Sequence, residues 1–113
     1  MSSRRASQRK GRAAERELAR LLQAAGYPAA PGPPVSFGAA PDVVGLQDVH
    51  VEVKNVARLD LPAALRQASE DAAYFGGLPC VFHRHRGGRW VVSMELAAWL
   101  GLYGRANGHH TKA

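Results

Sequence analysis

Two carboxylates and a lysine lie close together in the stretch PDVVGLQDVHVEVK, residues 41–54. Asp42 opens an apolar run, and Glu52 and Lys54 are two residues apart near the end of the stretch. Carboxylate oxygens are the ligands that hard divalent cations prefer, and an ammonium group beside them suits a negatively charged substrate. The stretch therefore has the residue types for metal-dependent chemistry on a phosphate. Because acid-x-Lys is also common on the solvated face of ordinary strands, the tripeptide alone does not separate the two interpretations.

The alternation of residue types predicts how these groups are positioned. Residues 49–54 alternate a valine with a polar residue, which is the period-2 pattern of a half-buried strand. We expect the valines to face a core and the polar residues, Glu52 among them, to share the opposite face. A turn over residues 45–48 would pair this strand with the run that begins at Asp42. Such a hairpin brings the two carboxylates to one end of a sheet.

A helix and a loop are expected ahead of this hairpin. Residues 13–25 are strong helix formers with an apolar stripe, and Gly26 is a natural stop. Glu15 and Glu17 lie at opposite margins of the stripe, so helical periodicity leaves open which of them faces the hairpin. Residues 27–40 hold four of the seven prolines, which predicts an extended loop with a short edge strand at its start.

A second helix is expected after the hairpin. Asp60 is a suitable N-cap, and Pro62 falls in the first turn, where its missing N–H does no harm. Gly76 ends the apolar stripe that this helix would bury. Gln67 lies off the stripe and is expected at the surface.

A basic hairpin and a third helix complete the predicted elements. Residues 79–85 and 89–93 are expected to pair across a two-residue turn at Gly87-Gly88. Ser93 is expected to cap a helix whose apolar end, residues 99–103, is a candidate dimer surface.

Composition narrows the class of protein. The chain has 113 residues, a hydrophobic content of 46% and a formal net charge of +6, which fits one small folded domain with a preference for nucleic acid. It has no apolar run long enough to span a bilayer and no secretory signal pattern. Cys80 is the only cysteine, which excludes an intrachain disulfide and a cysteine-based zinc site. We expect a cytoplasmic protein without a membrane partner.

The charge pattern predicts three regions. Residues 1–12 are expected to be a flexible basic arm, residues 13–103 the folded domain, and residues 104–113 a disordered tail. The arm would bind phosphates without reading sequence, although a solubilising tail explains its composition equally well. The predicted DNA-binding residues are Arg4, Arg5, Arg9, Lys10, Arg12, Arg16, Arg84 and Arg86.

In this order, the features resemble the PD-(D/E)xK nuclease superfamily and, within it, the Hjc-type Holliday junction resolvases of archaea and related phages. The resemblance rests on Arg9-Lys10-Gly11, Ala14-Glu15-Arg16-Glu17-Leu18, Ala25-Gly26-Tyr27, Pro41-Asp42-Val43-Val44, Val51-Glu52-Val53-Lys54 and Arg66-Gln67-Ala68. It runs from about Arg9 to Tyr103. It implies an α/β, restriction-endonuclease-like fold with a central mixed sheet of about five strands flanked by helices.

The resemblance also implies roles for individual residues. Asp42 and Glu52 correspond to metal ligands of the family, helped by the Val53 carbonyl, and Glu15 corresponds to its first-helix glutamate. Lys54 corresponds to the catalytic lysine. The remaining two catalytic candidates are Gln67, on the second helix, and Ser36, the serine available in the proline-rich loop.

The implied activity is the metal-dependent cutting of paired strands in four-way DNA by a homodimer. Mg²⁺ is the expected ion, with Mn²⁺ as a substitute and no further small-molecule cofactor. Two alternatives remain open. One is a repair or restriction-like nuclease acting on duplex or flap DNA, although the chain has no separate sequence-reading domain. The other is a non-catalytic, basic nucleic-acid-binding module.

Overall fold

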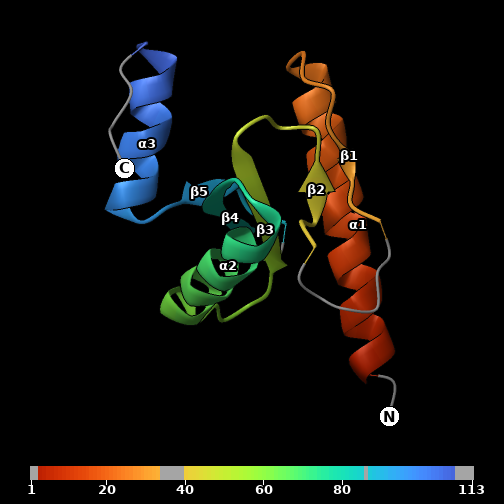
Figure 1. Ribbon diagram of the computed structural model, residues 1–113. Helices are drawn as coiled ribbons and strands as arrows, with labels where there is room; N and C mark the ends of the chain where they lie inside the picture. Colours follow the sequence, from red (N-terminus) through yellow and green to blue (C-terminus); the bar gives the residue numbers. More distant parts are fainter. Residues whose placement is uncertain (1–2, 34–39, 86, 109–113) are drawn as a thin grey trace.

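The computed structural model describes residues 3–33, 40–85 and 87–108, with side chains described from Gly11 onward. Figure 1 shows helices packed around one sheet in this part of the chain. The elements are α1 (Ser3–Ala24), β1 (Ala30–Pro31), β2 (Val43–Val44), β3 (Val49–Asn55), α2 (Leu61–Phe75), β4 (Leu78–Arg84), β5 (Val91–Ser93) and α3 (Leu96–Ala106). The predicted α/β class and five-stranded mixed sheet are confirmed.

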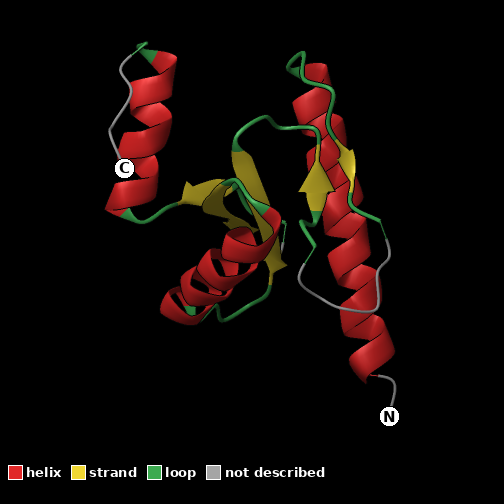
Figure 2. Ribbon diagram, viewed as in Figure 1, coloured by secondary structure: helices red, strands yellow, loops and turns green. Residues whose placement is uncertain are grey.

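The sheet has β3 at its centre and the order β1-β2-β3-β4-β5. β2 pairs with β3 in antiparallel fashion, with Val43 opposite Val51, so the predicted hairpin is present. β3 and β4 run parallel along seven residues each, and α2 supplies the crossover that a parallel pair requires. The remaining pairs, β1 with β2 and β4 with β5, are antiparallel (Figure 2).

Both faces of β3 are covered, so the expectation of a half-buried strand was wrong. On one face, Val51 and Val53 pack in a core that includes Ala14 and Leu18 of α1. The opposite face is covered by α2, whose buried residues include Ala64, Ala68 and Ala72. As a result, the polar positions of β3 are also enclosed: His50 is 1% exposed and Glu52 is 5% exposed. The parallel crossover explains this, because it places a helix over the second face of the sheet.

The second helix follows its sequence signals closely. Asp60 is the N-cap of α2, and its Oδ1 accepts a hydrogen bond of 3.1 Å from the Ala63 N–H. Pro62 lies in the first turn, and Gly76 closes the C-terminal end with a φ of 90°. The residues predicted to begin and end this helix therefore lie at its observed ends.

The first helix is longer than the expected range of residues 13–25. α1 begins at Ser3, so the segment expected to be a flexible arm has a helical backbone. Arginine, alanine, glutamine and lysine are all favourable helix formers, and they allow α1 to continue towards the N-terminus past its buried part.

The end of the chain differs from expectation in three places. The second hairpin closes with the Gly88 N–H donating to the His85 carbonyl at 2.8 Å, so the turn is not the predicted Gly87-Gly88 dipeptide. Ser93 lies in β5, where its hydroxyl contacts His83 Nε2 at 2.8 Å, and Glu95 takes the N-cap position of α3 instead. α3 continues to Ala106, beyond the expected start of a disordered tail.

None of the helices in the described part of the chain combines the length and apolar character needed to cross a bilayer.

Candidate active site

Asp42 is fixed by the hairpin that carries it. Its backbone N–H donates to the Val51 carbonyl at 2.9 Å, and its carboxylate Oδ2 accepts from the Val53 N–H at 2.7 Å. One side-chain oxygen of Asp42 is therefore held against β3 at Val53, the residue that follows Glu52. The predicted approach of these two carboxylates follows from the antiparallel pairing of β2 with β3.

Lys54 links β3 to α2. Its Nζ lies 3.5 Å from Glu52 Oε2 and 3.5 Å from Gln67 Oε1. The side chain of Glu52 is 7% exposed, whereas that of Lys54 is 29% exposed, so the ammonium group reaches from the buried acid towards solvent. Gln67 thus lies where the resemblance implied, although helical periodicity alone indicated only a surface position.

Helix α1 brings Glu15 close to Asp42. Burial is the main cause that raises the pKa of Glu15 to about 7, and the next cause is the negative charge of Asp42. Glu17 points elsewhere and forms an ion pair with Arg84 of β4. The choice between the two glutamates that helical periodicity left open is therefore decided by their contacts.

The charges at this acidic cluster, defined as Glu15, Asp42, Glu52 and Lys54, are unbalanced. Burial first, and then the charge of Asp42, raise the pKa of Glu52 to about 7, while Lys54 opposes the shift. Burial likewise raises the pKa of Asp42, against the hydrogen bond from Val53 and the charge of Lys54. The charge of Asp42 thus acts on both glutamates, and a divalent cation bound beside it would offset that repulsion. Among the described residues, the three potential ligands that lie within 4.8 Å of one another are His50, Glu52 and Asp71.

The predicted DNA-binding residues divide into three groups. Arg12 and Arg16 are exposed on α1 and lie close enough to Glu15 to lower its pKa. Arg84 is engaged within the protein: its guanidinium pairs with Glu17 and lies 4.6 Å from the centre of the Trp90 ring. Arg86 lies outside the described residues. So do the side chains of the N-terminal candidates, which are Arg4, Arg5, Arg9 and Lys10. Ser36 also lies outside the described residues.

Sequence reasoning missed two residues next to the cluster. His50, Glu52 and Asp71 place one potential ligand atom each within 4.8 Å of one another. His50 precedes Glu52 by two positions on the same face of β3, and Asp71 follows Gln67 by one helical turn on α2. Both spacings were readable in the sequence, but they gain meaning only once α2 is known to cover that face of β3.

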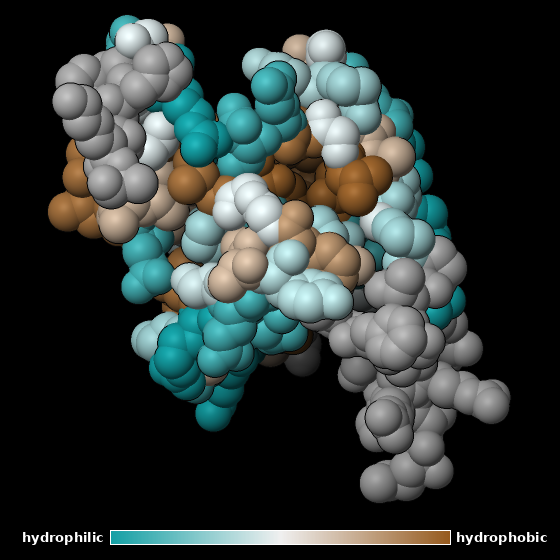
Figure 3. All heavy atoms as spheres, viewed as in Figure 1, coloured by the Kyte–Doolittle hydropathy of each residue, from teal (hydrophilic) through white to brown (hydrophobic). Residues whose placement is uncertain are grey.

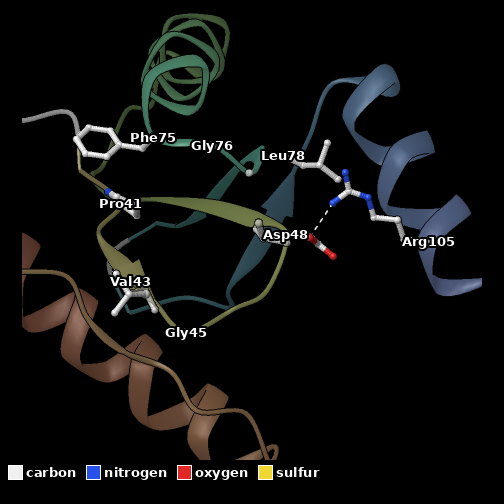
Figure 4. Close-up of a pocket in the computed structure, with 11 residues that line it drawn as sticks. Pro41, Val43, Gly45, Asp48, Phe75, Gly76, Leu78 and Arg105 are labelled. Atoms are coloured by element: carbon white, nitrogen blue, oxygen red, sulfur yellow. Dashed lines mark ion pairs between the residues drawn. The ribbon is translucent and has the colours of Figure 1, made fainter. Parts of the chain in front are cut away.

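A separate pocket lies near the start of β3 (Figure 4). It is lined by Pro41, Val43, Val44, Gly45, Asp48, Val49, Phe75, Gly76, Gly77, Leu78 and Arg105. Its two charged residues, Asp48 and Arg105, pair with each other at 3.0 Å. Because no member of the acidic cluster lines this pocket, we do not place the chemistry there.

Comparison with known proteins identifies a family and a solved structure to which this chain is similar. A family model described as archaeal Holliday junction resolvase (Hjc) matches residues 6–93, well over half of the chain. The solved structure of Hjc from the archaeal hyperthermophile Archaeoglobus fulgidus, a Holliday junction resolvase, aligns with a TM-score of 0.53 and 20% sequence identity. The alignment covers 91% of this chain and 99% of that chain, and at this identity it shows a shared fold. No curated protein sequence gives a significant match.

Proposed function

The chain belongs to the archaeal Holliday junction resolvase (Hjc) family, and we propose that it resolves four-way DNA junctions by metal-dependent hydrolysis at the acidic cluster. The observation that carries this proposal is convergence. Asp42, ahead of β2, lies close enough to Glu15 of α1 and to Glu52 of β3 for its charge to raise the pKa of both, and Lys54 Nζ lies 3.5 Å from Glu52 Oε2. A solvated acid-x-Lys strand would show no such convergence.

The oxygen-rich character of the cluster favours Mg²⁺, with Mn²⁺ as a substitute. Asp42, Glu52 and the Val53 carbonyl would hold the ion, and Glu15 would complete the shell directly or through water. When bound, such an ion lowers the pKa of a coordinated water and offsets negative charge on the phosphoryl group. The hydrogen bond from the Val53 N–H holds the Asp42 carboxylate in place before the ion arrives.

Lys54 supplies the cationic group of the reaction. Its ammonium lies between Glu52 and Gln67 and is partly exposed, so it can reach a phosphate or the attacking water while it remains anchored. In this position it offsets the charge that develops on the phosphoryl oxygens. Gln67 acts as a positioning residue, because its side-chain oxygen accepts from Lys54 and restricts where the ammonium points.

The basic residues of α1 are suited to guiding DNA into the site. Arg12 and Arg16 are exposed beside Glu15, so phosphates bound there would lie next to the acidic cluster. Contacts of this kind recognise shape and charge without reading bases, and they weaken as salt rises. A DNA substrate also agrees with the cytoplasmic location expected from the sequence.

Symmetric resolution of a junction needs two active sites related by a two-fold axis, and we assign the subunit contact to α3. Four large apolar side chains of this helix are exposed: Leu96 is 70%, Trp99 45%, Leu100 46% and Tyr103 55% exposed. Figure 3 shows apolar side chains on the outer side of the molecule, in the region of α3. Trp99 and Tyr103 stack with ring centres 4.8 Å apart, which gives the face a rigid aromatic centre.

The test compares a four-way junction with a linear duplex of equal length, each with and without Mg²⁺. We expect paired cuts in the junction only when Mg²⁺ is present. Equal cleavage of both substrates would favour the repair or restriction-like nuclease. Salt-sensitive junction binding without cleavage under any divalent ion would favour the non-catalytic binding module and reject the proposal.

A further inference from the structure

A second group of ligand atoms lies on the α2 side of β3. It consists of His50 and Glu52 of β3 and Asp71 of α2, whose potential ligand atoms all lie within 4.8 Å of one another. Ligand atoms that share an ion lie at most about twice the ion–ligand distance apart, and a spacing of this order is compatible with one ion among the three side chains. Glu52 is the only member shared with the acidic cluster.

The polar atoms of this group lack the partners that buried groups require. His50 is 1% exposed, and neither its Nδ1 nor its Nε2 has a hydrogen-bond partner among the described residues. Asp71 Oδ2 is also buried without a partner in the described structure. Buried polar groups are nearly always satisfied, so a ring with two unpartnered nitrogens facing a carboxylate with a free oxygen points to a missing ligand.

We propose that His50, Asp71 and Glu52 form a second cation site, selective for a first-row transition ion such as Mn²⁺, Co²⁺ or Zn²⁺. One imidazole nitrogen and two carboxylates favour such ions, whereas Mg²⁺ favours a shell made of oxygens only. The acidic cluster around Asp42 has no imidazole and keeps its preference for Mg²⁺. The two sites would therefore differ in the ion they prefer, with Glu52 between them.

The position of the site gives it a structural consequence. Its ligands come from β3 and from α2, the helix that also carries Gln67. A bound ion would tie the helix to the central strand next to the residue that orients Lys54. The inference concerns ion binding and does not depend on whether the chain cuts DNA, although the site adjoins the proposed catalytic residues.

The experiment is a Co²⁺ titration of the 113-residue chain in the presence of saturating Mg²⁺, monitored by calorimetry and by the visible absorption of the bound ion. We expect one tight Co²⁺ per chain in the wild type. His50→Gln and Asp71→Asn should each weaken this binding at least tenfold. His85→Gln, which removes an exposed imidazole by the same substitution, should leave it unchanged. Far-UV circular dichroism of each variant checks that it is folded.

Two further measurements make the outcome decisive. Co²⁺ should raise the thermal midpoint of the wild type and of His85→Gln, but not that of His50→Gln. Asp42→Asn should still bind Co²⁺, so loss of junction cleavage with retained Co²⁺ binding would separate the nuclease proposal from this one. Absence of tight Co²⁺ binding in the wild type, or equal binding by His50→Gln and His85→Gln, overturns the site; His50 would then be a histidine that pairs directly with Asp71.

Discussion

At the scale of single residues, the acidic cluster is a place where charge repulsion is retained inside a small fold. Asp71 adds to the crowding, because its charge acts on both Asp42 and Glu52. The ammonium group of Lys54 opposes the pKa shift of both acids. We expect such an arrangement to destabilise the metal-free protein and a bound divalent ion to offset this destabilisation. The same imbalance therefore predicts both the need for a cation and the behaviour of variants.

Asp42→Asn is expected to reduce the rate of junction cleavage about 100-fold or more, because it removes a charged ligand at the reacting centre. Binding of the junction in Ca²⁺ or without metal should stay within about twofold of the wild type, since the phosphate contacts come from arginines outside the cluster. The measurements are single-turnover cleavage and a gel-shift titration on the same junction.

Asp60→Asn is the matched control for that substitution. Asp60 caps α2 through the Ala63 N–H, and asparagine serves about equally well as an N-cap. The control should cut at close to the wild-type rate. Wild-type cleavage by Asp42→Asn would contradict the mechanism, whatever the control shows.

The raised pKa values of Glu15 and Glu52 predict how stability depends on pH. Each has a folded-state pKa of about 7 against an ordinary value of 4.5, so the folded protein binds more protons than the unfolded chain between these values. This contribution to stability is complete below pH 4.5 and is lost as the pH rises through about 7. In EDTA the thermal midpoint of the wild type should therefore fall relative to that of Asp42→Asn between pH 5 and 8. Mg²⁺ should restore it most at pH 8.

The comparison with Asp42→Asn is needed because His50 acts in the opposite direction. Burial lowers the pKa of His50, so its contribution to stability is present above its ordinary pKa of 6.5 and lost as the pH falls. That contribution is common to both proteins and cancels in the difference. A difference between the two midpoints that stays constant from pH 5 to 8 would show that Asp42 does not govern the two glutamates.

At the scale of the elements, one well-satisfied arginine adds a polar contact between α1 and the sheet to the apolar packing of Ala14 and Leu18. Arg84 of β4 donates to both carboxylate oxygens of Glu17 and to Asn55 Oδ1, and its side chain is only 12% exposed. Trp90 covers its guanidinium plane. Together with the packing of Ala14 and Leu18, this contact holds α1 against the sheet, and Glu15 lies two residues from Glu17 on the same helix.

Arg84→Ala should therefore reduce the free energy of unfolding by about 1–3 kcal/mol, measured by urea denaturation, because charge-assisted hydrogen bonds and a partly buried contact are lost. Its effect on the salt dependence of junction binding should be negligible. Arg12→Ala should behave in the reverse way. It should leave stability nearly unchanged and reduce the slope of log affinity against log salt by about 1, as expected for the loss of one phosphate contact.

These two variants test the assignment of the basic residues. If Arg84→Ala reduced the salt slope without affecting stability, Arg84 would be a DNA contact, as its charge alone suggested from the sequence. Equal effects of both variants on stability would instead show that Arg12 also holds α1 in place.

Local signals explain which parts of the fold were predictable. The N-cap Asp60 with Pro62, and the alternation in β3, depend on neighbours in sequence, so α2 and the hairpin were placed correctly. The burial of Glu52 and His50 was missed because it depends on the parallel crossover, which is a long-range property. The contacts that separate Glu15 from Glu17 are also long-range, and there the family resemblance supplied what the helical pattern left open.

At the scale of the whole molecule, the apolar face of α3 is the feature that folding of one chain leaves unexplained. Ala98 and Gly104 are the buried positions of this helix, whereas its larger apolar side chains are exposed. A helix that buries its small residues and exposes its large apolar ones presents a surface on which another protein surface can pack. Cutting both strands of a junction needs a second copy of the chain, which would supply such a surface.

Trp99→Glu should convert a dimer into a monomer at micromolar concentration, because a charge at the centre of the aromatic contact would have to be buried without a partner. The measurement is sedimentation velocity of the wild type and the variant. The variant should also nick a four-way junction in one strand at a time, so that nicked intermediates accumulate instead of paired products.

Tyr74→Glu is the matched control, since Tyr74 is an aromatic residue of α2 that is 81% exposed and lies outside the α3 face. It should sediment as a dimer and produce paired cuts. A dimeric Trp99→Glu protein would move the subunit contact to another surface. The two-fold assembly is inferred because a single acidic cluster cannot reach two opposed strands at once. A wild type that sediments as a monomer and still makes paired cuts would contradict that inference.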